Sequence, residues 1–302
     1  MALLLPGCSL SSHKATDHAP TDDLTSGHIT MVCSPDARTA IERSRAAFVK
    51  LYPDARLEIA DGTSRDAVAA LFGARADLAV ISRELVPEER RAAVQGRLGI
   101  DGYRFARDAA VMLVNPRNVV DNVTLDEVRK IYGGEIRNWS ELGGRGPIEP
   151  IVPAMGSDLM EFFSEAVMAG EPVQAKSLTA ANDSDAVRLV LQTPGAIGIV
   201  TLGALARGGK ALRLAALRGL PYYSPDPETV HDGRYPVTRF YNLYARSSGP
   251  ALVNGFITFV TSREGQQIVH QSGLVPTSVP VRFARRSPML GSHTQGDSIR
   301  TP

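Results

Sequence analysis

The sequence contains few of the residues on which cross-linked or metal-bound proteins depend. Its 302 residues include two cysteines, Cys8 and Cys33, and one tryptophan. Two cysteines are too few for a disulfide framework or a cysteine-rich metal site. We therefore expect no metal and no cofactor, and we interpret Cys33 as a small buried hydrophobic residue rather than a nucleophile.

The sequence also lacks an excess of charge of one sign and any long apolar run. Its 33 basic and 32 acidic residues are interspersed, so no basic stripe marks a nucleic-acid partner. Aromatic residues make up 6%, which argues against stacking on single strands. No stretch approaches the roughly 18 apolar residues of a membrane span. With 43% hydrophobic residues, the chain is expected to form one large or two modest globular domains.

Common catalytic motifs are missing as well. The sequence contains no Gly-x-Ser-x-Gly elbow, no His-Glu-x-x-His and no Cys-x-x-Cys pair, and its six histidines are scattered without spaced partners. We therefore predict a protein that is not an enzyme, and we retain a phosphoesterase-type enzyme as the third of three hypotheses.

The first residues, "MALLLPGCSL", resemble a bacterial lipobox, in which the signal peptide is cut before a cysteine that is then acylated. This motif predicts lipidation at Cys8, export to the cell envelope and a lipid anchor to a membrane. Polar residues rich in Ser, Asp and Pro follow it, so we interpret residues 1–27 as a signal remnant and flexible tether.

Short apolar runs alternate with helical periodicity along the rest of the chain. Strand patterns at 28–34, 55–60 and 76–82 each precede a helical pattern, which predicts a parallel sheet covered by helices. A second set of strand and helix patterns lies between residues 115 and 236. We predict an α/β fold of two lobes with a ligand cleft between them. Its parts are lobe 1 (28–103 plus 246–282), two crossing segments (104–114 and 237–245), lobe 2 (115–236) and a disordered tail (283–302).

Polar residues follow four of the predicted strands, where helices begin. Ligands in open α/β sheets lie beyond the carboxyl ends of the strands, and helix N-termini offer free N–H groups to anions. Ser, Thr and Asp are also ordinary helix N-caps, so each junction taken alone has two interpretations. Four together favour a shared oxyanion site, with these candidates: Ser34, Thr63, Ser64, Arg65, Ser82, Arg83, Gly156, Ser157 and Asp158.

Two of these candidates carry open alternatives. Arg65 lies in the first turn of a helix, where a cation opposes the helix dipole, so its partner is either a bound oxyanion or a nearby carboxylate, Asp61 or Asp66. Asp158 either faces the cleft, where it accepts a proton from hydrogen phosphate and repels sulfate, or faces solvent and balances the helix dipole.

Five segments resemble the phosphate-binding proteins of ABC uptake systems. They include "SREL" at 82–85, the segment 108–144 with its "RNWSELGG" turn, and the ranges 193–205, 224–245 and 256–278, so that the likeness covers about residues 28–280. The resemblance implies a type II periplasmic solute-binding protein that acts as a monomer. It also implies binding of phosphate or a similar oxyanion, and delivery to an ABC permease in the inner membrane.

The chain departs from the family where the ligand is held. Pro153 stands where the family has an arginine, Asp158 and Leu159 follow Gly156-Ser157 where the family has Gly-Thr, and the second junction lacks both family glycines. We therefore expect weaker phosphate binding or a different ligand. The rival hypothesis is a receptor-like envelope scaffold or sensor with impaired binding.

Overall fold

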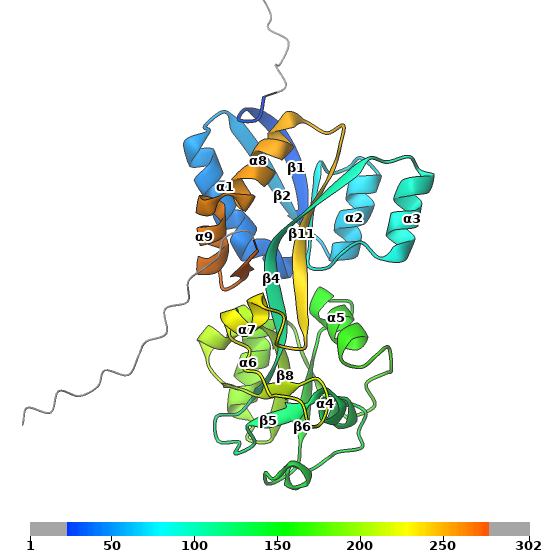
Figure 1. Ribbon diagram of the computed structural model, residues 1–302, viewed down its shortest axis with the longest axis vertical. Coiled ribbons are helices and arrows are strands. Elements are labelled where there is room, and N and C mark those ends of the chain that lie inside the picture. Colours follow the sequence, from blue (N-terminus) through cyan, green and yellow to red (C-terminus); the bar gives the residue numbers. More distant parts are fainter. Residues whose placement is uncertain (1–22, 278–302) are drawn as a thin grey trace, which may run out of the picture.

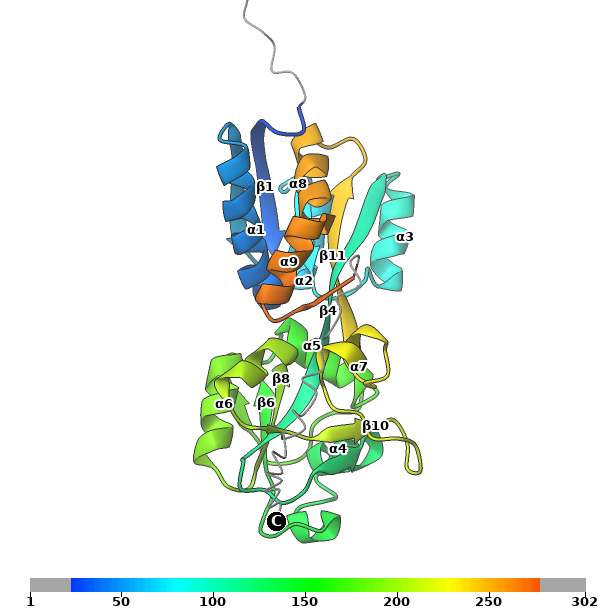
Figure 2. The same ribbon diagram turned by 60° about the vertical axis from the view of Figure 1, so that its left-hand side comes forward.

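The computed structural model describes residues 23–277. The predicted acylation site Cys8, most of the predicted tether and the predicted tail at 283–302 lie outside these residues. Figures 1 and 2 show two lobes, one above the other, joined by two long strands. The predicted two-lobed α/β fold is thus confirmed, whereas the exact residue boundaries of the lobes stay a prediction.

Lobe 1, the upper lobe in Figure 1, is built from strand–helix units, as the periodicity predicts. Its strands β1 (Gly27–Cys33), β2 (Ala55–Asp61) and β3 (Leu78–Ile81) are parallel, and β1 pairs with both of the others. The helices that follow them are α1 (Arg38–Leu51), α2 (Ser64–Phe72) and α3 (Pro87–Gln95), and a 3-10 turn, η1 (Pro35–Ala37), precedes α1. The chain returns to this lobe in α8 (Ala251–Thr261) and α9 (Arg263–Gln271).

Two antiparallel strands run through both lobes. Strand β4 (Ile100–Val114) pairs over residues 100–109 with β11 (Thr238–Arg246), and β11 also pairs with β3. The last part of β4 then pairs with β8 (Ala196–Thr201) of the other lobe. The sheet therefore continues from lobe 1 to lobe 2 in the order β2-β1-β3-β11-β4-β8-β6-β7.

Lobe 2 repeats the parallel arrangement on a smaller scale. Strand β6 (Glu149–Pro153) pairs in parallel with β7 (Leu178–Ala180) and with β8. The helices of this lobe are α4 (Leu125–Tyr132), α5 (Asp158–Ala166), α6 (Asp183–Gln192) and α7 (Pro227–His231). Smaller elements complete the described chain: β5 (Asn122–Thr124), β9 (Lys210–Ala211), β10 (Arg213–Ala215), β12 (Val275–Pro276), η2 (Trp139–Leu142) and η3 (Leu202–Arg207).

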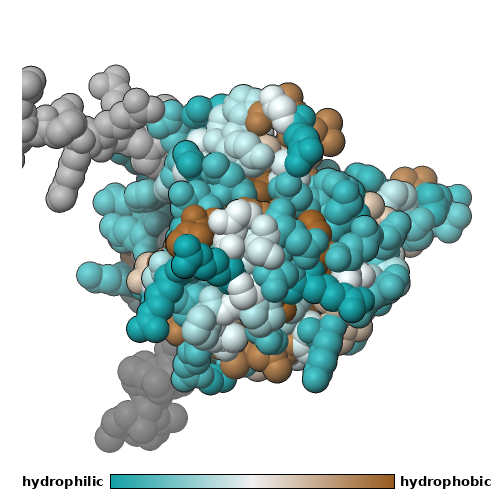
Figure 3. Space-filling model, turned by 90° about the horizontal axis from the view of Figure 1, so that it is seen from below, coloured by the Kyte–Doolittle hydropathy of each residue, from teal (hydrophilic) through white to brown (hydrophobic). Residues whose placement is uncertain are grey.

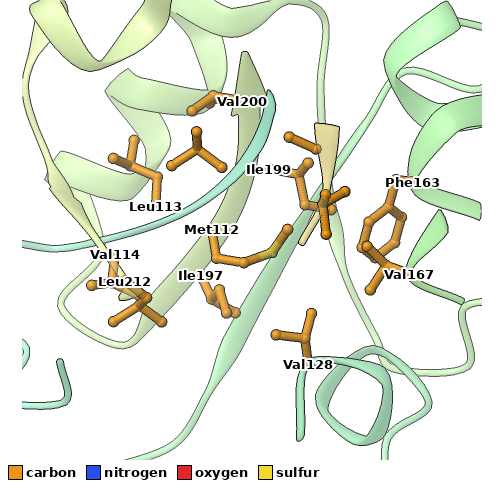
Figure 4. Close-up of a cluster of buried hydrophobic side chains, with 14 of the residues drawn as sticks. Met112, Leu113, Val114, Val128, Phe163, Val167, Ile197, Ile199, Val200 and Leu212 are labelled. Atoms are coloured by element: carbon orange, nitrogen blue, oxygen red, sulfur yellow. The ribbon is translucent and has the colours of Figure 1, made fainter. Parts of the chain in front are cut away.

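Each lobe has its own hydrophobic core. In lobe 1, α1, α8 and α9 pack on one face of the sheet around Phe48 and Phe256, while α2 packs on the other face through Leu71. In lobe 2 the end of β4 and strand β8 pack against α5, with Met112, Ile199 and others gathered as Figure 4 shows. Separate cores let each lobe keep its shape if the angle between the lobes changes.

The surface at the lobe 2 end is mostly hydrophilic, with small and separate apolar patches (Figure 3). None of the helices within residues 23–277 has the length and apolar character needed to cross a bilayer.

Candidate functional site

Three serines from three different junctions meet at one edge of the lobe 1 sheet. Ser34 follows β1, Ser64 begins the helix after β2, and Ser82 follows β3; all three are buried. They converge because the carboxyl ends of parallel strands lie at the same edge. The structure therefore brings these three residues together, whereas their role in binding an oxyanion stays a prediction.

Local structure leaves the serine donors available. Thr63 caps α2 through its own hydroxyl, which accepts a hydrogen bond from the Asp66 N–H at 3.2 Å. The backbone N–H and hydroxyl of Ser64, in the first turn, are therefore free to bind another group. Ser34 precedes η1, but its side chain makes no capping hydrogen bond. The Ser34 hydroxyl is therefore also free to bind a group outside η1.

All of these donors converge on the carboxylate of Asp158, which belongs to the other lobe. The Ser34 hydroxyl donates to Asp158 Oδ2 at 2.5 Å and the Ser64 hydroxyl at 2.9 Å, while the Ser64 N–H lies 2.9 Å from Oδ1 and 3.1 Å from Oδ2. Asp158 is 7% exposed. The Asp158 carboxylate thus faces lobe 1 and not solvent, whereas its preference for hydrogen phosphate over sulfate stays a prediction.

A chain of hydrogen bonds connects these serines to a buried arginine. The Ser82 N–H donates to Ser64 Oγ at 3.0 Å, and Arg239 Nη1 lies 3.4 Å from Ser82 Oγ. The Arg239 guanidinium forms ion pairs with Asp36 at 2.8 Å and with Asp108 at 3.1 Å. Burial raises the pKa of Asp36, while the charge of Arg239 opposes that rise. The Arg239 guanidinium is thus paired with Asp36 and Asp108, and it contacts the serine cluster only through its Nη1 atom beside Ser82.

A cavity of about 580 Å³ lies beside Asp158, between the lobes. Its walls include Thr39 and Arg43 from α1 and Asn182, Asp183 and Arg207 from lobe 2. This volume falls within the range of roughly 300–1,000 Å³ that small-molecule sites have. A solute that enters here meets Asp158 at the wall.

On the lobe 2 wall, Asp183 is held by the end of β8. The Thr201 hydroxyl donates to its carboxylate, and the Thr201 N–H does so at 3.2 Å. Burial raises the pKa of Asp183, although the two hydrogen bonds from Thr201 lower it. Within residues 23–277, no three His, Cys, Asp or Glu side chains gather in a way that suits a metal ion.

Three of the candidate residues contact groups other than the serine cluster. Thr63 caps α2, as described. Arg65 is largely exposed and pairs with Glu161 of α5 at 3.1 Å, which differs from each of the partners that we considered for it. Arg83 forms two hydrogen bonds with Glu89, at 2.7 and 2.8 Å. Their role as ligand contacts stays a prediction.

The turn before α5 places Asp158. Gly156 has φ of 77°, a left-handed conformation that favours glycine, and a Cβ there would meet no atom within 4 Å. Ser157 then caps α5, since its hydroxyl accepts from the Met160 N–H at 3.2 Å. Pro153 ends β6 and lines the cavity wall without supplying a charge.

Sequence reasoning did not single out Arg239 or Asp108. Both lie in strands that we assigned as crossing segments, and in an amphipathic strand a lone charge is usually solvent-exposed. The available signal for Asp108 was its position: a charged residue within the long apolar run at 105–114 is costly unless it is paired.

Comparison with known proteins places this geometry in a family. Residues 18–264 match the family model described as "PBP superfamily domain". The phosphate-binding protein PstS of Bacillus subtilis is 24% identical over 274 residues, covering 89% of this chain and 87% of that one. PstS of Pseudomonas aeruginosa PAO1 is 23% identical and covers 87% and 86%.

Solved structures share the fold. A Clostridium perfringens protein, solved with bound phosphate, superposes with a TM-score of 0.72 at 25% identity, covering 83% of this chain and all 100% of that one. A phosphate transport receptor of Vibrio cholerae gives 0.71 at 21% identity, covering 82% and 99%. On the family match over most of its length, together with its two lobes and the cleft between them, this chain belongs to the PBP superfamily.

Proposed function

We propose that this chain is the solute-binding receptor of an ABC uptake system and that its solute is phosphate or a related oxyanion. The names of the curated relatives and the bound phosphate of the Clostridium perfringens protein support this solute class. One observation carries the proposal. The donors of Ser34 and Ser64, at the carboxyl edge of the lobe 1 sheet, converge on a pair of carboxylate oxygens.

The chemistry of these donors suits an oxyanion. Hydroxyl and backbone N–H groups that point to one place form short, charge-assisted hydrogen bonds with anionic oxygens. The edge of a phosphate group presents two such oxygens, as a carboxylate does. Ser82 lies directly behind Ser64 and extends the same cluster. Because the donors are neutral, we expect weaker affinity than in a site with an arginine at position 153.

The test is a thermal-shift and calorimetry panel with phosphate, sulfate, molybdate and organophosphates. A ligand present at about 100 times its Kd stabilises the folded protein by about 2.7 kcal/mol, which a melting curve resolves. We expect phosphate to stabilise the protein. Failure of every anion, at concentrations up to several millimolar, would contradict the proposal.

A serine pair provides the matched control for the site. Ser64→Ala removes a hydroxyl that donates to the carboxylate oxygen, and hydrogen bonds to charged groups contribute about 1.5–3 kcal/mol, so phosphate affinity should fall about tenfold or more. Ser140→Ala removes an exposed hydroxyl in η2 of lobe 2 and should leave the affinity unchanged. Equal losses in both variants would place the anion elsewhere.

The second candidate function is a receptor-like envelope scaffold or sensor with impaired solute binding. The observation that favours it is Asp158, whose carboxylate already uses the donors that an oxyanion needs. The same panel separates the two candidates, since a scaffold shows no stabilisation by any anion. We propose no catalysis in either case. Release of product from p-nitrophenyl phosphate would instead favour the phosphoesterase hypothesis.

We further propose that the protein is exported, works as a monomer beside an inner-membrane permease and is anchored by acylated Cys8. The support for the anchor is the lipobox-like "LLPGCS" sequence. Cys8→Ser should move the protein from the membrane fraction to the soluble envelope fraction, because one residue carries the whole attachment. Cys33→Ser changes a buried thiol and should not change the fractionation. Membrane association that survives Cys8→Ser would disprove the anchor.

A further inference from the structure

We propose that Asp158 is an internal ligand of this receptor: its carboxylate fills the anion position of lobe 1 and latches the two lobes together when no solute is bound. This inference rests on the proposed function, since it takes the Ser34 and Ser64 donors as the anion site. It adds that an incoming oxyanion must displace a carboxylate of the protein itself.

The contacts of Asp158 are those expected of a bound anion. Two hydroxyls and one backbone N–H donate to its two oxygens at 2.5–3.1 Å, and the side chain is 7% exposed. Within residues 23–277 no basic side chain is ion-paired with Asp158, and Arg65, Arg83 and Arg239 each pair with other carboxylates. A buried carboxylate costs several kcal/mol unless it is hydrogen-bonded, so these donors must hold it in place.

Asp158 joins lobe 2 to lobe 1 by hydrogen bonds. It begins α5 of lobe 2, while its partners lie 124 and 94 residues away in lobe 1. Figures 1 and 2 both place α5 at the end of lobe 2 that faces lobe 1. Because each lobe has its own core, the lobes can change their angle about β4 and β11 without disrupting either core. Hydrogen bonds that cross this gap therefore favour the closed arrangement.

The helix itself does not require Asp158 in this place. Ser157 already caps α5 through Met160, and an acidic residue that merely balances a helix dipole can do so from solvent. Glu161, one turn further along, illustrates the ordinary case: it forms an exposed ion pair with Arg65 across the same gap. The burial of Asp158 is thus explained by the lobe 1 donors and not by the local needs of α5.

Competition between solute and latch follows from the shared donors. A phosphate that used the Ser34 hydroxyl and the Ser64 N–H would lie against the Asp158 carboxylate, and the like charges would repel each other. Solute therefore binds when Asp158 has left the site, and the apparent affinity falls by the fraction of molecules that are unlatched. The cavity beside Asp158 gives the solute a route to this position.

The decisive experiment compares Asp158→Ala with Glu161→Ala in the full-length protein carrying Cys8→Ser. Both variants lose one acidic residue of α5 that contacts lobe 1, but Asp158 alone of the two occupies the serine donors. Spin labels on Val94→Cys of lobe 1 and Val119→Cys of lobe 2, at positions 78% and 66% exposed, report the distance between the lobes. Buried Cys33 stays unlabelled.

Without any solute, Asp158→Ala should give a longer and broader distance distribution than the wild-type protein, while Glu161→Ala should match the wild type. If the latched form makes up about 90% of the wild-type protein, Asp158→Ala should also bind phosphate about tenfold more tightly by calorimetry. Asp158→Asn keeps the size of the side chain and removes its charge, so its distance distribution and its phosphate affinity should lie between those of the wild type and of Asp158→Ala. This variant also tests the latch if the alanine variant misfolds.

The outcomes separate the latch from the proposed function. A longer distance in Asp158→Ala with no anion binding in any variant would support the latch and contradict the receptor role. Unchanged distance and unchanged affinity in both Asp158 variants would overturn the latch, whether or not phosphate binds. Weaker phosphate binding by Asp158→Ala would also overturn it, since Asp158 would then be a contact for the solute.

Discussion

Arg239 and Asp108 lie opposite each other on the two strands that join the lobes, β11 and β4, and form an ion pair of 3.1 Å in which both side chains are buried. The Tyr241 hydroxyl donates to the same Asp108 oxygen at 2.8 Å, and Asp36 of lobe 1 forms a second ion pair with Arg239 at 2.8 Å. The buried group of Arg239, Asp108, Asp36 and Tyr241 contacts the serine cluster through Ser82 and connects it to strands β4 and β11, about which the lobes can change their angle.

Removal of the arginine should strongly destabilise the protein. Arg239→Met leaves Asp36 and Asp108 without their cation, and loss of one partner of a buried pair costs about 3–5 kcal/mol. Urea unfolding followed by circular dichroism measures the change. The matched control is Arg234→Met, which removes exposed ion pairs with Glu228 and Asp232 and should cost much less than Arg239→Met. Similar losses in the two variants would contradict the importance that we assign to the buried group.

Ser157 should affect stability through its cap. Its hydroxyl accepts from the Met160 N–H, and replacement of a serine N-cap by alanine costs about 1 kcal/mol, so Ser157→Ala should lower the free energy of unfolding by that amount. Ser164→Ala, inside the same helix, should be neutral or slightly stabilising because alanine is the better helix former. Equal stability of Ser157→Ala and wild type would show that the cap contributes nothing.

Arg83 and Glu89 should show a measurable coupling. Their side chains are partly buried and joined by two hydrogen bonds, so we expect a coupling energy of about 1 kcal/mol from a double-mutant cycle with Arg83→Ala and Glu89→Ala. A cycle with the exposed pair Arg91 and Glu88 provides the control and should give a much smaller coupling. A coupling near zero for the first pair would free Arg83 for its predicted role at the ligand.

Asp183 should make stability fall as the pH rises. Burial raises its pKa in the folded protein above the value in the unfolded chain, so the folded state holds the proton more tightly. Its contribution is then fully present below the unfolded pKa and is lost as the pH rises through the folded pKa. Compared with Asp183→Asn, wild-type stability should therefore decrease as the pH rises above about 4, the ordinary pKa of an aspartate in an unfolded chain.

Asp185, two residues along the same helix, provides a control of opposite sign. Hydrogen bonds from the Ala181 N–H and the Arg188 side chain lower its pKa, so its contribution is present above the unfolded pKa and is lost as the pH falls. Urea unfolding of Asp185→Asn beside Asp183→Asn should give opposite trends with pH. Parallel trends would show that burial does not control Asp183.

The sequence by itself determined the elements and the edge where they meet. Apolar runs followed by helical periodicity specify the strand–helix units that begin with β1, β2 and β3, and parallel strands bring their carboxyl ends to one edge. The sequence alone could therefore predict that Ser34, Ser64 and Ser82 lie at the same edge of the sheet. The α/β fold class followed in the same way, since strand patterns that alternate with helical patterns predict a parallel sheet covered by helices.

Tertiary structure decided which polar side chains cap helices and which face the cleft. Thr63 and Ser64 are neighbours of similar chemistry, yet one caps α2 and the other binds Asp158, because local sequence contains no information about the group across the gap. The direction of Asp158 and the pairing of Arg239 with Asp108 depend on contacts between residues about a hundred positions apart. Such contacts arise from the packing of two lobes, which no pattern within a single helix or strand can specify.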